Sequence, residues 1–192
     1  MIHLVRHGET EWSRSRRHTG RTDIPLTEAG RRQAAELRPV LDRLAPDTVL
    51  SSPLRRARET ATLTGHGSAA VIDDRLREWD YGSAEGRTTA ELRQTEPGWS
   101  VWTHPIDGGE QLADVSKRVD DLVEDLAALP GVIVVFGHAH LFRILAARWC
   151  GLPPEAGARF VLDPASLSTL GYERTTRCVI RWNAGVDRHS FG

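Results

Sequence analysis

Several residue types and patterns are scarce in this chain of 192 residues. Its two cysteines, Cys150 and Cys178, are too few for a disulfide framework or a cysteine-based zinc site. No apolar run is long enough to span a membrane. The chain also starts directly in a strand-like segment, so we expect no signal peptide, no membrane association and a cytoplasmic location.

An excess of charge of one sign is also lacking, because the net charge is only −1. This balance does not favour a nucleic-acid partner. Lysine is almost absent: Lys117 is the only one, and the other 24 basic residues are arginines. Guanidinium groups bind phosphate through paired donors. A compositional bias of the genome is nevertheless a sufficient explanation for the excess of arginine, so we infer phosphate binding only from individual arginines.

The apolar residues that are present alternate between strand and helix patterns. The expected strands are 2–5, 48–51, 70–72 and 132–136, and the expected helices are 27–44 with a break at Pro39, 52–63, 112–129 and 141–149. This alternation predicts an α/β three-layer sandwich, with a mostly parallel central sheet and helices on both faces. Segments 168–173 and 178–182 predict a C-terminal antiparallel hairpin. The length suits a single domain over residues 1–192.

Two of the apolar strands end in a histidine, His7 after the first and His138 after the fourth. Parallel strands bring their carboxyl ends to one edge of the sheet, where α/β folds bind ligands. The two imidazoles can therefore meet there if their strands are neighbours. Because Arg6 precedes His7, the first of these strand ends also offers a cation.

The second strand leads into a helix whose first turn is basic. Ser52 is expected to cap this helix and Pro53 to occupy its first position. Arg55 and Arg56 follow, and helical spacing does not separate their roles. The free N–H groups of such a helix start also favour an anion. Together with the two histidines, these groups predict a phosphate site.

Four motifs, in this order, resemble those of the histidine phosphatase superfamily, also called the phosphoglycerate-mutase-like family. They are Arg6-His7-Gly8-Glu9-Thr10, Ser52-Pro53-Leu54-Arg55-Arg56-Ala57, Leu76-Arg77-Glu78-Trp79-Asp80-Tyr81-Gly82 with Glu85-Gly86, and Gly137-His138. The chain further resembles a phosphatase branch that includes bacterial acid phosphatases and the yeast sedoheptulose-1,7-bisphosphatase. The motifs that carry this resemblance are Glu11-Trp12-Ser13 with His18-Thr19-Gly20, Glu78-Trp79-Asp80-Tyr81-Gly82, and His138-Ala139-His140 with Ala146-Ala147-Arg148-Trp149. Ser13 and Ala139 depart from that pattern, since many members carry Asn and Gly there.

The resemblance implies a metal-independent phosphatase that hydrolyses small-molecule phosphate monoesters without a cofactor. His7 would be the nucleophile, kept neutral by nearby arginines, and Glu78 the general acid and base. Arg6 and Arg56 would clamp the phosphoryl group and His138 would stabilise it during transfer. The positions that match substrate contacts are Ser13, Thr19, Gly20 and Tyr81.

Several alternatives stay open. His138, His140 and Glu78 have the residue types of a metal site, and a phosphate-binding module on the same scaffold is a non-enzymatic alternative. Mutase-type phosphoryl transfer or a sugar bisphosphatase of narrow specificity are enzymatic ones. Residues 78–138 hold only four basic residues, Arg87, Arg93, Lys117 and Arg118, which favours a phosphatase over a mutase.

Three further features have two interpretations each. The loop from Trp99 to Trp102 either covers the site or packs against the domain. His140 either joins the site or lies outside it, and Glu110 is expected to be a first-turn carboxylate of the long helix. A homodimer is also left open.

Overall fold

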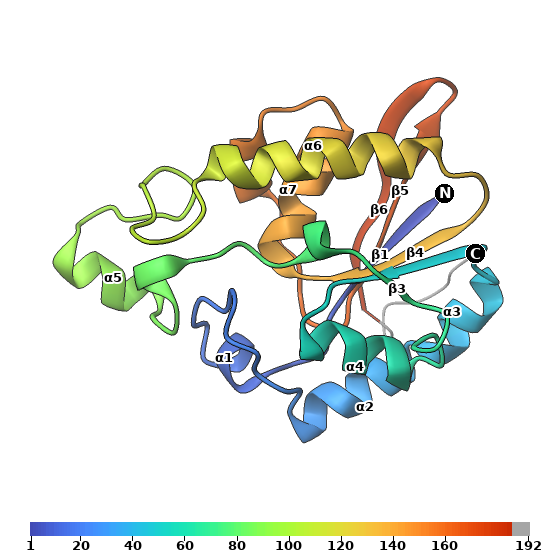
Figure 1. Ribbon diagram of the computed structural model, residues 1–192, viewed down its shortest axis with the longest axis horizontal. Coiled ribbons are helices and arrows are strands. Elements are labelled where there is room, and N and C mark those ends of the chain that lie inside the picture. Colours follow the sequence, from blue (N-terminus) through green and yellow to red (C-terminus); the bar gives the residue numbers. More distant parts are fainter. Residues whose placement is uncertain (186–192) are drawn as a thin grey trace.

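Six strands form one mixed sheet in the computed structural model, which describes residues 1–185 (Figure 1). Their order across the sheet is β3-β2-β4-β1-β5-β6, and β1 to β4 are mutually parallel, while β5 and β6 are antiparallel to their neighbours. The strands are β1 (Ile2–Arg6), β2 (Thr48–Ser51), β3 (Val71–Ile72), β4 (Ile133–Gly137), β5 (Leu167–Glu173) and β6 (Thr176–Ala184). The predicted mostly parallel sheet and its C-terminal hairpin are confirmed.

Helices cover both faces of the sheet because successive side chains of a strand point to opposite faces. In β1, Leu4 packs into the core beneath α6 (Leu112–Ala128) and α7 (Ala139–Trp149). Val5 packs into the core on the other face, which the remaining long helices cover (Figure 1). These are α2 (Glu28–Glu36), α3 (Arg38–Leu44) and α4 (Arg55–Leu63).

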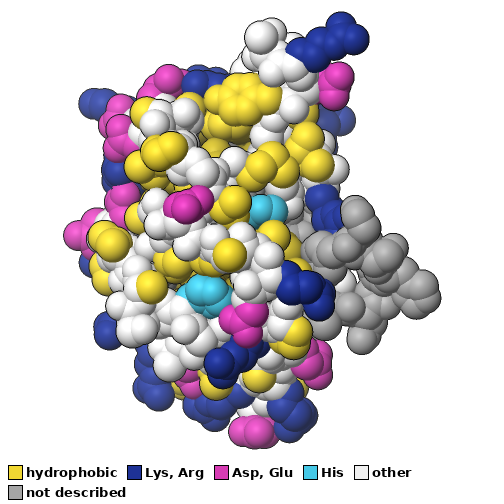
Figure 2. Space-filling model, turned by 90° about the vertical axis from the view of Figure 1, so that its right-hand side faces the viewer, with side chains coloured by type: hydrophobic (Ala, Val, Ile, Leu, Met, Phe, Trp, Pro, Cys, Tyr) yellow, Lys and Arg dark blue, Asp and Glu magenta, His cyan; other side chains and the backbone are white. Residues whose placement is uncertain are grey.

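Short elements lie mainly in the loops that connect this framework. They are α1 (Glu11–Arg14), α5 (Thr89–Thr95), and the 3-10 turns η1 (Asp74–Leu76), η2 (Gly82–Ala84) and η3 (Pro154–Arg159). α1 and α5 lie beyond the carboxyl ends of the parallel strands, at the left of Figure 1. At the other end of the sheet, exposed apolar side chains lie among charged and polar ones (Figure 2). No helix within residues 1–185 is long and apolar enough to cross a membrane.

Two helix starts differ from the prediction. α4 begins at Arg55 rather than at Pro53, and its N-cap residue Leu54 supplies no side-chain bond. The Ser52 hydroxyl accepts from Leu54 N at 3.3 Å, ahead of the first helical residue, and lies 2.7 Å from a ring nitrogen of His138. α7 begins directly after His138, which is its N-cap residue. The expected break at Pro39 is confirmed, since Pro39 falls in the first turn of α3, where its missing N–H costs nothing.

His3 in β1 makes the stability of the fold sensitive to acid. The ring is buried, Nδ1 lies 3.1 Å from Thr169 Oγ1, and burial lowers the pKa of His3 from 6.5 to about 4. The unfolded chain therefore binds a proton more readily than the folded one. The contribution of neutral His3 to the free energy of unfolding is complete above pH 6.5 and is lost as the pH falls towards 4.

Between pH 7.5 and 5.5, we expect His3 alone to lower the free energy of unfolding by about 1 kcal/mol. Denaturant unfolding of the wild type and of His3→Gln at both pH values measures this contribution. The variant should lose about 1 kcal/mol less than the wild type over this range, and His66→Gln should behave as the wild type. Equal losses in the wild type and in His3→Gln would contradict the assignment.

Candidate active site

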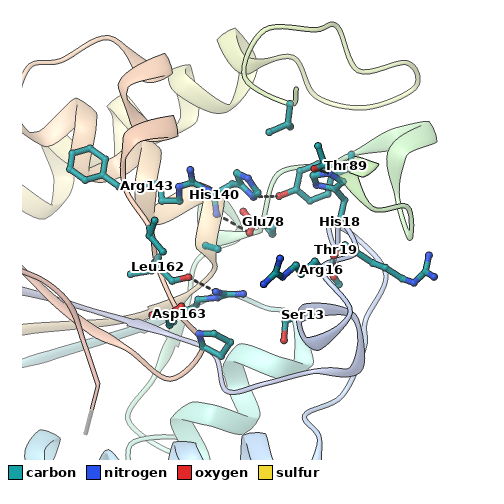
Figure 3. Close-up of a pocket in the computed structure, with 18 of the residues that line it drawn as sticks. Ser13, Arg16, His18, Thr19, Glu78, Thr89, His140, Arg143, Leu162 and Asp163 are labelled. Atoms are coloured by element: carbon teal, nitrogen blue, oxygen red, sulfur yellow. Dashed lines mark hydrogen bonds between the residues drawn. The ribbon is translucent and has the colours of Figure 1, made fainter. Parts of the chain in front are cut away.

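A cavity of about 570 Å³ lies at the carboxyl ends of β1 and β4 (Figure 3). β1 and β4 are direct neighbours, and Arg6 pairs with Gly137 in their register. The histidines that follow these strands therefore come together, with 5.3 Å between the ring centroids of His7 and His138. This confirms the convergence that the two strand ends predict.

The ring of His7 is oriented by the backbone next to it. Its Nδ1 lies 2.7 Å from Gly8 O, and since a carbonyl oxygen only accepts, Nδ1 carries the proton. The lone pair of the neutral ring is then on Nε2. Burial holds the pKa of His7 well below its usual range, and the charges of Arg56 and Arg6 lower it further. His7 is thus a neutral imidazole on the cavity wall.

Arg56 is fully buried and orients His138 through a hydrogen bond. Its Nε donates to His138 Nδ1 at 3.2 Å, which leaves the proton of the neutral His138 ring on Nε2, directed at Ser52. Its Nη1 and Nη2 groups donate to the carbonyl oxygens of Thr19, Gly20 and Thr22. Of its five N–H groups, one Nη1–H lacks an acceptor within residues 1–185. Arg56 therefore has a single donor left, rather than a pair. Neither Arg56 nor His138 is among the residues that line the cavity, and both are fully buried behind His7.

Arg6 faces the cavity more directly. Its Nη1 donates to Leu162 O, whereas its buried Nε has no hydrogen-bond partner in the described part of the chain. Burial lowers the pKa of Arg6 to about 10, so the side chain stays a cation at neutral pH. An unpaired buried donor is costly, and an anion in the cavity would satisfy it.

The side chain of Glu78 is buried against the N-terminus of α7. Its Oε1 accepts from Trp79 N at 3.0 Å and Leu141 N at 2.9 Å, while Oε2 accepts from His140 N at 3.1 Å. The carboxylate therefore satisfies free N–H groups of α7, which has no side-chain cap of its own. Oε2 accepts only one of these bonds and therefore has a lone pair available for a further hydrogen bond.

Glu110 has a different role from the one expected. α6 begins two residues later, at Leu112, so Glu110 is not in its first turn. Its carbonyl accepts from Trp79 Nε1 at 2.8 Å, and its carboxylate accepts from Asp80 N at 2.9 Å and pairs with Arg118. The first-turn prediction is wrong, because Glu110 instead fixes the segment that carries Glu78.

The four predicted substrate positions divide in the structure. Ser13, Thr19 and Tyr81 line the cavity, whereas Gly20 does not. The hydroxyl of Ser13 is already bonded to both backbone groups of Thr10, and Tyr81 Oη lies 2.7 Å from His140 Nδ1. His140 lines the cavity as well, and burial lowers its pKa well below the usual range.

The loop around Trp99 satisfies both of its interpretations. Trp99 is buried and packs against His18, with 5.2 Å between ring centroids. Ser100, Val101 and Trp102 line the cavity. The same stretch therefore anchors itself in the core and forms part of the cavity wall.

Sequence reasoning missed most of the cations around the cavity. Of the four basic residues counted between Glu78 and His138, only Arg93 lines it, and Arg16, Arg17 and Arg143 come from outside that stretch. Arg143 lies within α7, with Nε donating to Gly157 O at 3.0 Å and its guanidinium 4.7 Å from the Trp102 ring centre. The count of basic residues between Glu78 and His138 therefore underestimates the positive charge around the cavity. Helical spacing from His140 was the one signal for Arg143.

Arg16 and Arg143 approach the cavity from different directions. Figure 3 shows Ser13 and Arg16 on one side, Leu162 and Asp163 across from them, and Arg143 beside His140. Neither arginine has a carboxylate within ion-pair distance in the described residues. Glu78 and Asp163 are the acidic residues of the lining, against five arginines. The cavity is therefore suited to an anion.

Comparison with known proteins decides the family. The model of the histidine phosphatase superfamily (branch 1) matches residues 2–185. The chain belongs to the histidine phosphatase superfamily. An acid phosphatase of Mycobacterium tuberculosis is 42% identical over 178 residues, covering 91% of this chain and 87% of its own.

Relatives of this histidine phosphatase carry more than one activity in their names. A probable phosphoglycerate mutase GpmB of Cronobacter sakazakii is 32% identical, covering 94% of this chain and 89% of its own. A mycobacterial glucosyl-3-phosphoglycerate phosphatase, solved in complex with VO3, has a TM-score of 0.85 and 31% identity over 96% of this chain and 98% of that one. The predicted family and its phosphatase character are confirmed.

Proposed function

We propose that this histidine phosphatase hydrolyses small phosphate monoesters in two steps, with a phosphoryl group carried transiently on His7 Nε2. The observation that carries the proposal is the neutral His7, whose Nδ1 proton is fixed on Gly8 O while Nε2 is free to attack. In the first step Nε2 bonds to phosphorus as the bond to the ester oxygen breaks. In the second, water displaces His7 and releases inorganic phosphate.

Glu78 supplies the proton in the first step and takes one in the second. It would protonate the departing ester oxygen and then accept a proton from the attacking water. Arg6 contributes charge and free N–H groups to the phosphoryl oxygens, and Arg56 contributes charge with one N–H. His138, held between Arg56 and Ser52, donates its Nε2 proton towards the transferring group once Ser52 rotates away.

The acid phosphatase-like, metal-independent subtype is part of this proposal. The ring nitrogens of His138 are bonded to Arg56 and Ser52, and His140 Nδ1 is bonded to Tyr81. No group of three or more His, Cys, Asp or Glu within residues 1–185 is arranged to hold a metal ion. Cationic side chains supply the positive charge that a metal would otherwise bring to the phosphoryl group.

A sugar bisphosphatase is the second candidate function, and the cavity's extra cations favour it. Arg16, Arg93 and Arg143 line the cavity in addition to Arg6, so they offer positive charge for a second phosphoryl group. A screen of phosphate monoesters that includes sugar bisphosphates separates the two candidates. A kcat/KM that is uniform across monoesters supports the broad phosphatase, and one concentrated on bisphosphates supports the narrow enzyme.

The phosphatase proposal predicts hydrolysis rather than isomerisation. With 3-phosphoglycerate as substrate, inorganic phosphate should form and 2-phosphoglycerate should not, with or without added 2,3-bisphosphoglycerate. The rate should not change in the presence of a strong chelator. Efficient isomerisation that depends on the bisphosphate primer would contradict the phosphatase assignment, and loss of activity with the chelator, restored by a metal, would contradict metal independence.

A further inference from the structure

Glu85 directs a carboxylate at the loop behind the cavity without reaching the cavity itself. Its Oε1 accepts hydrogen bonds from Gly20 N at 2.9 Å and Thr22 N at 3.0 Å. Its Oε2 is buried and has no hydrogen-bond partner among the described residues. No lysine or arginine in residues 1–185 lies within ion-pair distance of it. An anion in this position needs a compensating charge nearby.

The same loop binds the buried cation from its other side. Arg56 Nη2 donates to Thr19 O and to Gly20 O, at 3.0 Å each. The peptide group that joins Thr19 to Gly20 therefore has its carbonyl on Arg56 and its N–H on Glu85. One peptide dipole thus bridges a carboxylate and a guanidinium, with each end next to the charge that stabilises it. Burial lowers the pKa of Arg56, and the charge of Glu85 is among those that oppose this shift.

From Arg56 the contacts continue to the reacting group. Arg56 Nε donates to His138 Nδ1 at 3.2 Å, and the His138 ring packs beside His7, with 5.3 Å between centroids. The orientation of His138 thus depends on a guanidinium that is itself held by the 19–22 loop. Any shift of that loop would be passed to His138.

Gly20 shows how closely this loop is fitted. A Cβ at Gly20 would lie 2.4 Å from Trp79 O and 2.7 Å from Glu85 Oε2. The backbone of Trp79 cannot move aside as a flexible side chain can. Only glycine therefore fits at position 20 while the loop stays within hydrogen-bond distance of Glu85. This packing, rather than contact with substrate, accounts for Gly20.

We propose that Glu85 is a positioning residue for Arg56 and His138, acting through the Thr19–Gly20 peptide group. The proposal rests on the phosphatase function inferred above. In this proposal, both the negative charge of Glu85 and its hydrogen bonds help to orient Arg56 and His138. Glu85 does not line the cavity, so we expect its loss to affect turnover more than substrate binding.

Glu85→Gln tests the charge, because glutamine keeps the shape and one acceptor oxygen. We expect kcat to fall about tenfold with KM within about twofold, and Glu85→Ala to lose about 10²-fold, the scale of a small misplacement at a reacting centre. Glu59→Gln is the matched control: Glu59 also has a buried oxygen without a hydrogen bond, but it forms ion pairs with Arg31 and Arg55 away from the cavity. It should retain wild-type kcat.

The ¹⁵N–¹H resonance of the Arg56 Nε–H group, assigned with Arg56→Lys, gives a readout that does not depend on activity. It should shift in Glu85→Gln and stay in place in Glu59→Gln. Wild-type kcat and an unshifted resonance in Glu85→Gln would overturn the proposal. If Glu85→Gln does not fold, Glu85→Asp is judged by the same two readouts. A wild type without phosphatase activity would contradict the proposed function, while the resonance would still test Glu85.

Discussion

Replacing His7 by alanine is expected to lower kcat by roughly 10⁴-fold or more while the chain still folds. The reason is that Nε2 of His7 is the one nucleophile that the proposed first step uses, and its loss leaves only binding and charge. The hydrogen bond to Gly8 O is lost as well, but the ring of His7 lines the cavity, so water can occupy the space that the ring leaves.

Steady-state hydrolysis of a nitrophenyl phosphate by wild type and His7→Ala measures the effect. His66→Ala serves as the control, since His66 follows the C-terminal end of α4 and lies outside the cavity lining. Circular dichroism and thermal melting should show both variants folded. Activity in His7→Ala within tenfold of the wild type would show that another group, or water itself, attacks phosphorus.

Replacing Glu78 by glutamine is expected to lower kcat by about 10²–10⁴-fold with an alkyl phosphate as substrate. Glutamine cannot give up or take the proton that the two steps require. The loss should be much smaller in the first step with a nitrophenyl phosphate, because that leaving group departs without protonation. The second step is the same for both substrates, whereas kcat/KM reports the steps up to release of the alcohol. The ratio between the losses in kcat/KM for the two substrates is therefore the diagnostic quantity.

The ratio also separates chemistry from structure. In the wild type, backbone N–H groups of α7 donate to the carboxylate of Glu78. In Glu78→Gln the side-chain NH2 group would face one of these N–H groups, and because both are donors, the folded protein loses some stability as well. That cost falls on the folded enzyme and affects both substrates equally. Glu110→Gln is a useful comparison, since Glu110 holds the same segment without facing the cavity. Equal losses for both substrates in Glu78→Gln would show that Glu78 is not the acid.

The pairing of His7 with His138 could be predicted because it depends on local pattern and on one rule of topology. Each histidine directly follows an apolar strand, and parallel neighbours deliver their ends to one edge. The long helix α6 and the terminal hairpin could also be predicted, since both follow from the periodicity of apolar residues in the sequence. These features depend on residues that are close in sequence.

What could not be predicted depends on contacts between distant segments. Arg56 spends most of its donors on the carbonyls of the 19–22 loop, and Ser52 bonds to His138 instead of capping α4. Gly20 allows that loop to pack closely against Trp79, and Arg143 lines the cavity from within α7. Side-chain type alone does not indicate any of these partners, because each is set by how the loops pack against one another.

The central claim is that hydrolysis passes through a phosphoryl group on His7, and a rapid acid-free denaturing quench tests it most directly. Wild-type enzyme is mixed with a phosphate monoester labelled in its phosphoryl group, quenched during turnover and digested. The account predicts an acid-labile, base-stable label on the peptide that contains His7, and no label in His7→Ala. Turnover of the labelled ester without any phosphorylated enzyme, or with the label on a different residue, would contradict it.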